Sequence, residues 1–417
     1  MGTDHQQEIA RSEEKSPSYR WLIVGLLLLN QEGTSLPFSG VGMLLPAMRK
    51  DLGFGVAQAG VLSSLLRFPQ AILGIPASLL LVRFRPKWVY FLAILGDAAA
   101  SFLVARSPGF IILAFAFAFH GVGMVLKQIP DTLLKRQWIA KKEFATVMGI
   151  TQGAMALGSS GIIMILPFLL IALGSWRNLY IIAGSILLFL SAVWVVFAKE
   201  RITAEYQDGM SSRDGQAPLK GVLKRKEFPL IGFAKLGSGL TYSTTMLFVP
   251  TFLLEERGIA LSTIGIIVGL LPLGGVFANL TIGFISDKIG LRKPTIWPAG
   301  LLEPFLYAAL IFSPLPVVAL SVISFTIGYV AWAPFPALGA IPFELPNIKP
   351  SEIVVGNSLI MTITTLGGLI AVPIVGYLAE ALGSLRTALL ITCFFPWTVA
   401  IAGFILPETG IKAHSKI

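Results

Sequence analysis

The sequence predicts an all-α membrane protein with twelve transmembrane helices. Of its 417 residues, 55% are hydrophobic and only 13% are charged, whereas soluble domains carry about 25% charged residues. The apolar residues gather in twelve long runs, and roughly 20 apolar residues are enough to cross a bilayer. The lipid bilayer is therefore the expected surroundings of most of the chain.

The first six runs occupy residues 21–198. They follow a tail, residues 1–20, which carries seven charges. The first run is longer than the short apolar region of a signal peptide, so no cleavable signal is expected. Charged pieces and the turn Arg106-Ser107-Pro108-Gly109 separate the runs. The expected spans are residues 21–46, 56–81, 88–106, 109–133, 146–171 and 177–198.

The last six runs occupy residues 228–406. The longest polar stretch, residues 199–227, precedes them and ends in Lys224-Arg225-Lys226. Because it lies near the middle of the chain, we expect it to be a cytoplasmic linker between two halves. Residues 407–417 form a second tail. The expected spans are residues 228–253, 260–285, 294–313, 315–343, 352–379 and 385–406.

The basic residues predict the orientation of the chain. Most of the 32 Lys and Arg residues fall in the tails and loops on one side, which the positive-inside rule assigns to the cytoplasm together with both termini. The net charge of +10 therefore requires no nucleic-acid partner. The single Cys393 and three histidines leave little material for a metal site, and no cofactor is expected. Because metalloprotease, phosphate-loop and nucleophile-elbow motifs are missing, we expect neither catalytic residues nor an enzyme.

An internal duplication relates the two halves. The segment Ala172-Leu173-Gly174-Ser175-Trp176-Arg177 recurs as Ala381-Leu382-Gly383-Ser384-Leu385-Arg386, at an offset of 209 residues. Other pairs agree, such as Pro46 with Pro250 and Gly149 with Gly356. Six spans bring the chain back to its starting side, so both halves enter the membrane from the same side. This parallel repeat is typical of some secondary transporters.

A family resemblance is carried by the loop between the eighth and ninth runs. It reads Gly283-Phe284-Ile285-Ser286-Asp287-Lys288-Ile289-Gly290-Leu291-Arg292-Lys293. This segment resembles the loop signature of the major facilitator superfamily: Gly, three residues, Asp, a basic residue, one residue, Gly, then basic residues. We expect Gly283 to allow close helix approach, Gly290 to form the turn and Asp287 to cap or pair. The cations, Lys288, Arg292 and Lys293, should hold the loop on the cytoplasmic side.

The resemblance implies a twelve-helix transporter in which spans 1, 4, 7 and 10 line a central cavity. The copy of the loop in the first half departs from the signature, because Leu81 replaces the Asp and Phe84 the Gly. Phe117 also stands where many proton-coupled members carry an Arg. These departures weaken the interpretation as a drug–proton antiporter. The segments Gly40–Pro46 and Glu344–Pro346 resemble permeases for small anions, such as cyanate or nitrate, and for organic acids.

Six ionisable side chains stand inside the expected spans, where each costs at least about 2.5 kcal/mol and usually faces protein or a wet cavity. Asp97 and Glu303 are 206 residues apart, so we expect equivalent positions that serve either structural pairing or proton coupling. Arg67 could clamp a carboxylate with its bidentate fork, or bind Asp97 or helix carbonyls. Lys127 could bind substrate, or pair with Asp131 one turn later. The six are Glu32, Arg67, Asp97, Lys127, Lys235 and Glu303.

Glu32 and Lys235 lie at nearly the same depth on related inner helices. They could form an ion pair that acts as a gate, or Lys235 could bind substrate while Glu32 carries a proton; a purely structural pair is equally compatible. His120 could titrate near neutral pH or serve packing. Aromatic residues of spans 7 and 10 could face the cavity or pack within the protein: Tyr242, Tyr329 and Trp332.

The leading functional hypothesis is a secondary active transporter that moves a small anion, most readily an organic one, by alternating access. Proton symport and exchange both remain open. Three of the charges on lining or flanking spans are cations and one is an acid, which favours an anionic substrate. The alternative is export of amphipathic or cationic compounds with Glu32 as the acidic anchor. We expect a functional monomer in the plasma (inner) membrane.

Overall fold

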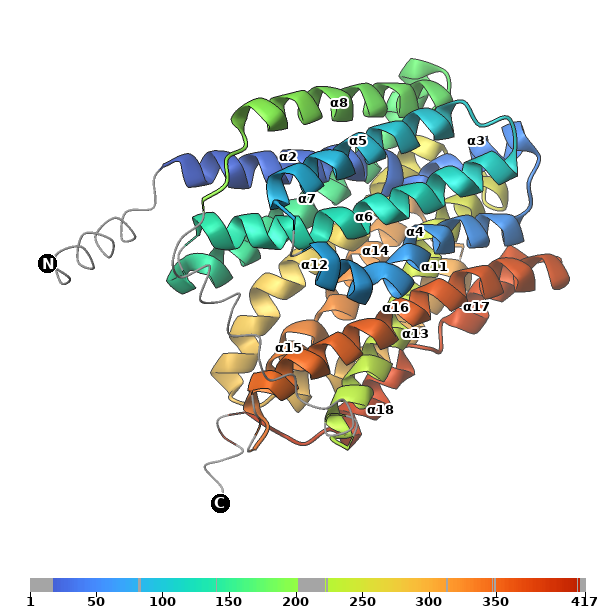
Figure 1. Ribbon diagram of the computed structural model, residues 1–417. Coiled ribbons are helices and arrows are strands. Elements are labelled where there is room, and N and C mark those ends of the chain that lie inside the picture. The colour runs from blue at the N-terminus through green and yellow to red at the C-terminus, as the bar shows by residue number, and fades with distance from the viewer. Residues whose placement is uncertain are drawn as a thin grey trace, which may run out of the picture.

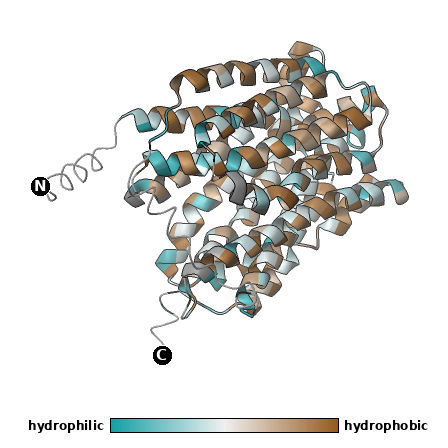
Figure 2. Ribbon diagram, viewed as in Figure 1, coloured by the Kyte–Doolittle hydropathy of each residue, from teal (hydrophilic) through white to brown (hydrophobic). Residues whose placement is uncertain are grey.

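The computed structural model describes residues 18–81, 84–139, 141–201, 222, 224–312, 314–346, 348, 350–410 and 412. In these ranges every regular element is a helix. The blue-to-green helices of the first half lie beside the yellow-to-red helices of the second (Figure 1). Hydrophobic residues dominate along the helices, and hydrophilic residues gather mainly near their ends (Figure 2). Most of the expected linker and tails lies outside the described residues.

The helices of the first half follow the expected spans closely, with one interruption. The first span is broken at residues 39–40. Pro37, just before the break, lacks a backbone N–H donor, and Gly40 at the break lacks a side chain, so both weaken a continuous helix there. The elements are α2 (Tyr19–Phe38), α3 (Val41–Leu52), α4 (Val56–Leu81), α5 (Pro86–Ala105), α6 (Phe110–Trp138), α7 (Lys141–Leu173) and α8 (Trp176–Phe197).

The helices of the second half show two further interruptions. The tenth span breaks before Pro334 and the twelfth before Trp397, which follows Pro396, because proline cannot donate the hydrogen bond that continues a helix. The elements are α11 (Glu227–Glu255), α12 (Leu261–Ile289), η1 (Lys293–Thr295), α13 (Trp297–Phe312), α14 (Val317–Trp332), α15 (Pro334–Glu344), α16 (Pro350–Ala381), α17 (Leu385–Thr392) and α18 (Trp397–Ile405).

Nine helical segments of the described chain are long and apolar enough to cross a membrane. The other three expected spans correspond to α2 with α3, to α4 and to α11. Of these, α2 and α11 carry buried polar residues such as Asn30 and Thr241, which reach the interior rather than lipid. The helix order therefore agrees with twelve spans.

The sequence duplication is a structural duplication. Gly174 and Gly383 adopt left-handed backbone conformations with φ of 67° and 63°, which glycine tolerates without steric conflict. The two arginines that end the repeated segments bind equivalent loops: Arg177 donates to the Ser107 carbonyl at 3.0 Å, and Arg386 to the Phe312 carbonyl at 2.7 Å. One helical unit therefore occurs twice.

The halves meet closely at the end of the molecule opposite Tyr19. Arg49 of α3 forms an ion pair with Glu255 of α11 at 3.2 Å, and these two residues occupy equivalent ends of α3 and α11. A Cβ at Gly60 of α4 would lie 2.6 Å from the Val372 carbonyl of α16. Only glycine permits this approach of backbones, so the contact depends on these residues.

Two other helices carry glycines four residues apart, a spacing that is typical of close helix packing in membranes. Gly265 and Gly269 of α12 pack in this way, because a Cβ at either position would collide with α7. Gly149 and Gly153 of α7 do not pack closely against another helix, because a Cβ there would meet no described atom within 4 Å. They lie towards the opposite end of α7, where the halves do not touch at these positions.

Candidate functional site

A central cavity of about 750 Å³ lies between the two halves. It is lined by α2, α3, α4, α6 and α7 of the first half and by α11, α12 and α16 of the second. The lining runs from Gly42, next to the closed contacts, to Leu27, Lys135 and Met148 near the ends of their helices on the Tyr19 side. The cavity therefore extends away from the closed end and towards the side where the described chain begins.

Arg67 of α4 lines this cavity. Its Nη1 donates a 3.1 Å hydrogen bond to the Ser243 hydroxyl of α11 and lies against Gly368 of α16. No carboxylate of the described chain comes within ion-pair distance of it. The alternative pairing with Asp97 is wrong, because Asp97 has other partners.

A polar cluster joins α2, α5 and α6 at the cavity wall, where Thr34, His120 and Lys127 line the cavity and Asp97 lies behind them. Asp97 is 0% exposed, and its carboxylate lies 2.7 Å from Lys127 Nζ and 2.8 Å from His120 Nδ1. The Thr34 hydroxyl donates to the same carboxylate at 3.2 Å and accepts a hydrogen bond from Lys127. The His120 ring stacks on Phe38 at 3.5 Å. The structure thus joins three predicted site residues and adds Thr34.

The alternative pairing of Lys127 with Asp131 is also wrong. Asp131 instead binds Lys135, one turn further along α6, at 2.8 Å. In an α-helix each Cα–Cβ bond tilts towards the N-terminus. The side chain of Lys135 therefore extends towards Asp131, whereas the side chain of Lys127 extends away from it. Lys127, Asp131 and Lys135 all line the cavity. Both lysines therefore have a carboxylate partner, which Arg67 lacks among the described residues.

Glu303 of α13 repeats part of the Asp97 cluster in the second half. The Ser238 hydroxyl of α11 donates to its carboxyl group at 3.0 Å, as Thr34 does to Asp97. Both acids are 0% exposed, which supports their assignment as equivalent positions. The position equivalent to Lys127, 206 residues later, is Ala333, so the second half lacks the lysine that pairs with Asp97. Within the described chain, Glu303 Oε1 has no hydrogen-bond partner.

The suggested gate between Glu32 and Lys235 does not form. The Glu32 carboxylate lies against Gly158 of α7, and the described residues give it no hydrogen-bond partner. Lys235 Nζ lies 5.1 Å from the ring centroid of Phe335 of α15. Neither residue is part of the cavity lining. Equal depth on related helices did not determine which face each side chain occupies, and the acidic anchor for cation export is missing from the cavity.

The predicted aromatic residues fall at three different places. Tyr242 lines the cavity. Trp332 forms a second layer, with its ring 6.1 Å from Tyr242 in an edge arrangement and 4.9 Å from Phe335 in a stack. Tyr329 lies outside the lining, because its hydroxyl is 2.9 Å from that of Thr281 on an exposed part of α12. Of the three candidates, Tyr242 alone is part of the cavity lining that the structure describes.

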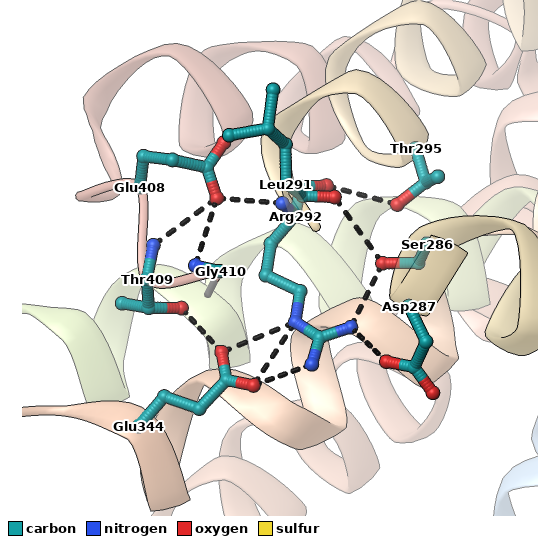
Figure 3. A network of polar contacts seen from close by, with 9 residues as sticks. All are labelled: Ser286, Asp287, Leu291, Arg292, Thr295, Glu344, Glu408, Thr409 and Gly410. Carbon is teal, nitrogen blue, oxygen red and sulfur yellow. Dashed lines mark hydrogen bonds and ion pairs between the residues drawn. The ribbon is translucent and has the colours of Figure 1, made fainter. Parts of the chain in front are cut away.

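The loop motif forms a separate network at the end of α12 (Figure 3). Arg292 Nη1 lies 2.6 Å from Asp287, and Nη2 lies 2.5 Å from Glu344 of α15. Hydrogen bonds to Glu344 raise the pKa of the Arg292 guanidinium above its ordinary value. Gly290 forms the predicted turn with φ of 72°. Asp287 forms an ion pair with Arg292, which is one of the two roles predicted for it, the other being a helix cap.

The second half of this network was not predicted. The Glu408 carboxylate accepts hydrogen bonds from the backbone N–H groups of Arg292 at 2.6 Å and Lys293 at 3.0 Å. Lys293 also donates to the Phe404 carbonyl, whereas Lys288 is exposed. A Cβ at Gly283 would meet Pro336 at an ordinary 3.8 Å, so close approach does not require glycine there. The network ties the loop to the segment after α18.

A family model described as the Major Facilitator Superfamily matches residues 27–348. The chain belongs to this superfamily. A probable sulfoacetate transporter, SauU, of Cupriavidus necator is 23% identical over 383 residues, with 88% of each chain covered. A hexuronate transporter of Bacillus subtilis is 22% identical over 256 residues, with 60% of each chain covered.

Solved structures show the same superfamily fold. A bacterial homolog of the human lysosomal transporter Spinster, in an inward-facing and unoccupied conformation, matches with a TM-score of 0.75 and 15% identity, covering 94% of this chain and 97% of the other. A point mutant of the nucleoside transporter NupG matches with a TM-score of 0.76 and 17% identity, covering 92% of this chain and 99% of the other. As a member of the superfamily, the chain is a multi-pass membrane transporter and not an enzyme, as predicted.

Proposed function

We propose that this protein is a secondary active transporter that moves a small organic anion by alternating access. It acts as a monomer in the plasma membrane, with both termini in the cytoplasm. The relatives named for sulfoacetate and hexuronate, both anions, support this substrate class. Contacts between the two halves close the end of the molecule opposite Tyr19, and the cavity extends towards the other end. Both features support a conformation that faces the cytoplasm.

The observation that carries the proposal is that Arg67 is a cation without a carboxylate partner among the described residues. Its guanidinium lines the central cavity, and the part of the chain that the structure describes offers it no carboxylate. A cation in a low-dielectric setting favours an anion that replaces the lost hydration. A guanidinium also presents paired donors that match a carboxylate or sulfonate. Arg67 therefore binds the anionic group, and the Ser243 hydroxyl supports its orientation.

The Asp97 cluster supplies the coupling site in this proposal. Lys127 contacts buried Asp97 and also lines the cavity, so it connects a proton site to the substrate compartment. Lys127 and His120 stabilise the ionised Asp97 carboxylate, so Asp97 takes up a proton only when a substrate anion in the cavity balances the charge on Lys127. A substrate anion is then bound more strongly when a proton is present. This linkage gives proton–anion symport.

The test is anion binding to the purified, detergent-solubilised protein, measured as thermal stabilisation by matched carboxylates, oxyanions, neutral solutes and lipophilic cations. We expect stabilisation by anions, weakened about 10- to 150-fold in affinity by Arg67→Gln, because a hydrogen bond to a charged group contributes about 1.5–3 kcal/mol. Arg106→Gln, at the end of α5 outside the cavity, is the matched control. Unchanged affinity in Arg67→Gln, or stabilisation by lipophilic cations alone, contradicts the proposal.

A further inference from the structure

The cavity wall beside Arg67 carries uncharged amide groups. Gln70 lies three residues after Arg67 on α4, which places it about one helical turn away on the same face. Its side-chain nitrogen donates a 3.2 Å hydrogen bond to the side-chain oxygen of Gln128 on α6. Gln31 of α2 and Gln152 of α7 line the same cavity. Four helices of the first half thus each contribute one glutamine to the wall.

The bond between Gln70 and Gln128 leaves one acceptor and one donor group available. A glutamine amide carries an accepting oxygen and a donating NH₂ group. Among the described side chains, the Gln70 oxygen and the Gln128 nitrogen have no hydrogen-bond partner, and Gln128 is exposed within the cavity. A ligand hydroxyl both donates and accepts, so a single hydroxyl group satisfies both atoms.

The charges of the wall limit the charge of the ligand. Lys127 and Lys135 are bound to Asp97 and Asp131, so their charges are already balanced. Arg67 is the cation of the described lining that has no carboxylate partner. While Asp97 is ionised and paired with Lys127, a ligand with one anionic group balances this charge, whereas a second anionic group would face only lysines that are already paired.

We infer that the cavity selects hydroxylated monocarboxylates. The carboxylate binds Arg67 and Ser243, and a hydroxyl group about one helical turn away binds Gln70 and Gln128. This inference rests on the proposed anion transport and adds the substrate class. Gln70 and Gln128 are then specificity residues, which discriminate by the hydroxyl groups of a ligand rather than by its charge.

The test compares three ligands of different chemistry by titration calorimetry on the full-length protein in detergent. Gluconate is a hydroxylated monocarboxylate, hexanoate has the same carbon number without hydroxyl groups, and succinate is a dianion. We expect gluconate to bind at least tenfold more tightly than the other two. Gln70→Leu and Gln128→Leu should each weaken gluconate about three- to tenfold, as the loss of a neutral hydrogen bond predicts, and leave hexanoate unchanged.

The matched control is Gln58→Leu. Gln58 also lies on α4, but its amide accepts a hydrogen bond from Gly55 at the closed end, outside the cavity. Equal binding of all three ligands, preference for succinate, or equal losses for gluconate and hexanoate in the glutamine variants overturns the inference and leaves the anion site intact. If no carboxylate binds, or if Arg67→Gln binds gluconate normally, the proposed function fails as well. If Gln70→Leu does not fold, Gln128→Leu decides.

Discussion

The closed end of the molecule offers a sharp test of alternating access. Gly60 of α4 and Gly376 of α16 face each other's backbones: a Cβ at either position would lie 2.6 Å from a carbonyl oxygen, of Val372 and Val56 respectively. Ordinary contact begins near 3.4 Å. A Gly60→Ala substitution therefore forces α4 and α16 apart by roughly 0.8 Å or strains both helices.

The energetic cost falls on the closed conformation alone. Overpacking of a tight interface costs about 1–3 kcal/mol, so the ratio of closed to open molecules at this end should fall about 5- to 150-fold. Spin labels on cysteines at Lys50 and Glu256, in a Cys393→Ser background, report the distance between α3 and α11 at this end. We expect Gly60→Ala and Gly376→Ala to add a population with a longer distance.

The control is the same substitution at Gly25 of α2, where a Cβ meets no described atom within 4 Å. Gly25→Ala should reproduce the distance distribution of the parent protein. Because the two test positions lie on different helices of one interface, both must act in the same direction. If both give the distribution of the Gly25→Ala control, the closed contact does not depend on these glycines and the reasoning is refuted.

Two further predictions concern the buried and the loop ion pairs. Asp97→Asn should lower the free energy of unfolding by about 3–5 kcal/mol, because Lys127 loses its buried counter-ion, and adding Lys127→Met should recover part of this loss. Thermal unfolding of the two variants checks it; equal melting temperatures of the single and double variants would exclude coupling. Glu344→Gln should cost about 1.5–3 kcal/mol through its hydrogen bonds to Arg292. Limited proteolysis of the loop after α12 should then be faster, and an unchanged rate would show that the network does not hold this loop.

Much of the fold was predictable because membrane helices are determined by local sequence. A run of about 20 apolar residues fits the bilayer, and backbone groups in lipid must bond within the same helix. The breaks at Pro334 and before Trp397 were missed, since a proline inside a membrane span does not reveal by itself whether the helix bends or stops. The duplicated segment ending in Arg177 and Arg386 was predicted and adopts equivalent structures.

The candidate site was predictable as a set of charged residues and one aromatic residue, Tyr242. Arg67 and Lys127 stood out because charge is rare in a membrane span. Gln70 and Gln128 gave no comparable signal, since an uncharged amide is less costly to place there. The Glu408 contact was missed because it joins segments more than 100 residues apart.

The sequence by itself determined the number and order of the spans, the duplication and the depth of each ionisable residue. Only the tertiary structure decided that Lys127 turns to Asp97, that Glu32 and Lys235 point to different helices, and that Arg67 is left without a carboxylate among the described residues. The physical reason is that lipid is as apolar as the protein interior. A membrane helix therefore lacks the clear polar stripe that shows which face of a soluble helix is buried. Depth follows from residue position, but rotation about the helix axis is set by packing against neighbouring helices.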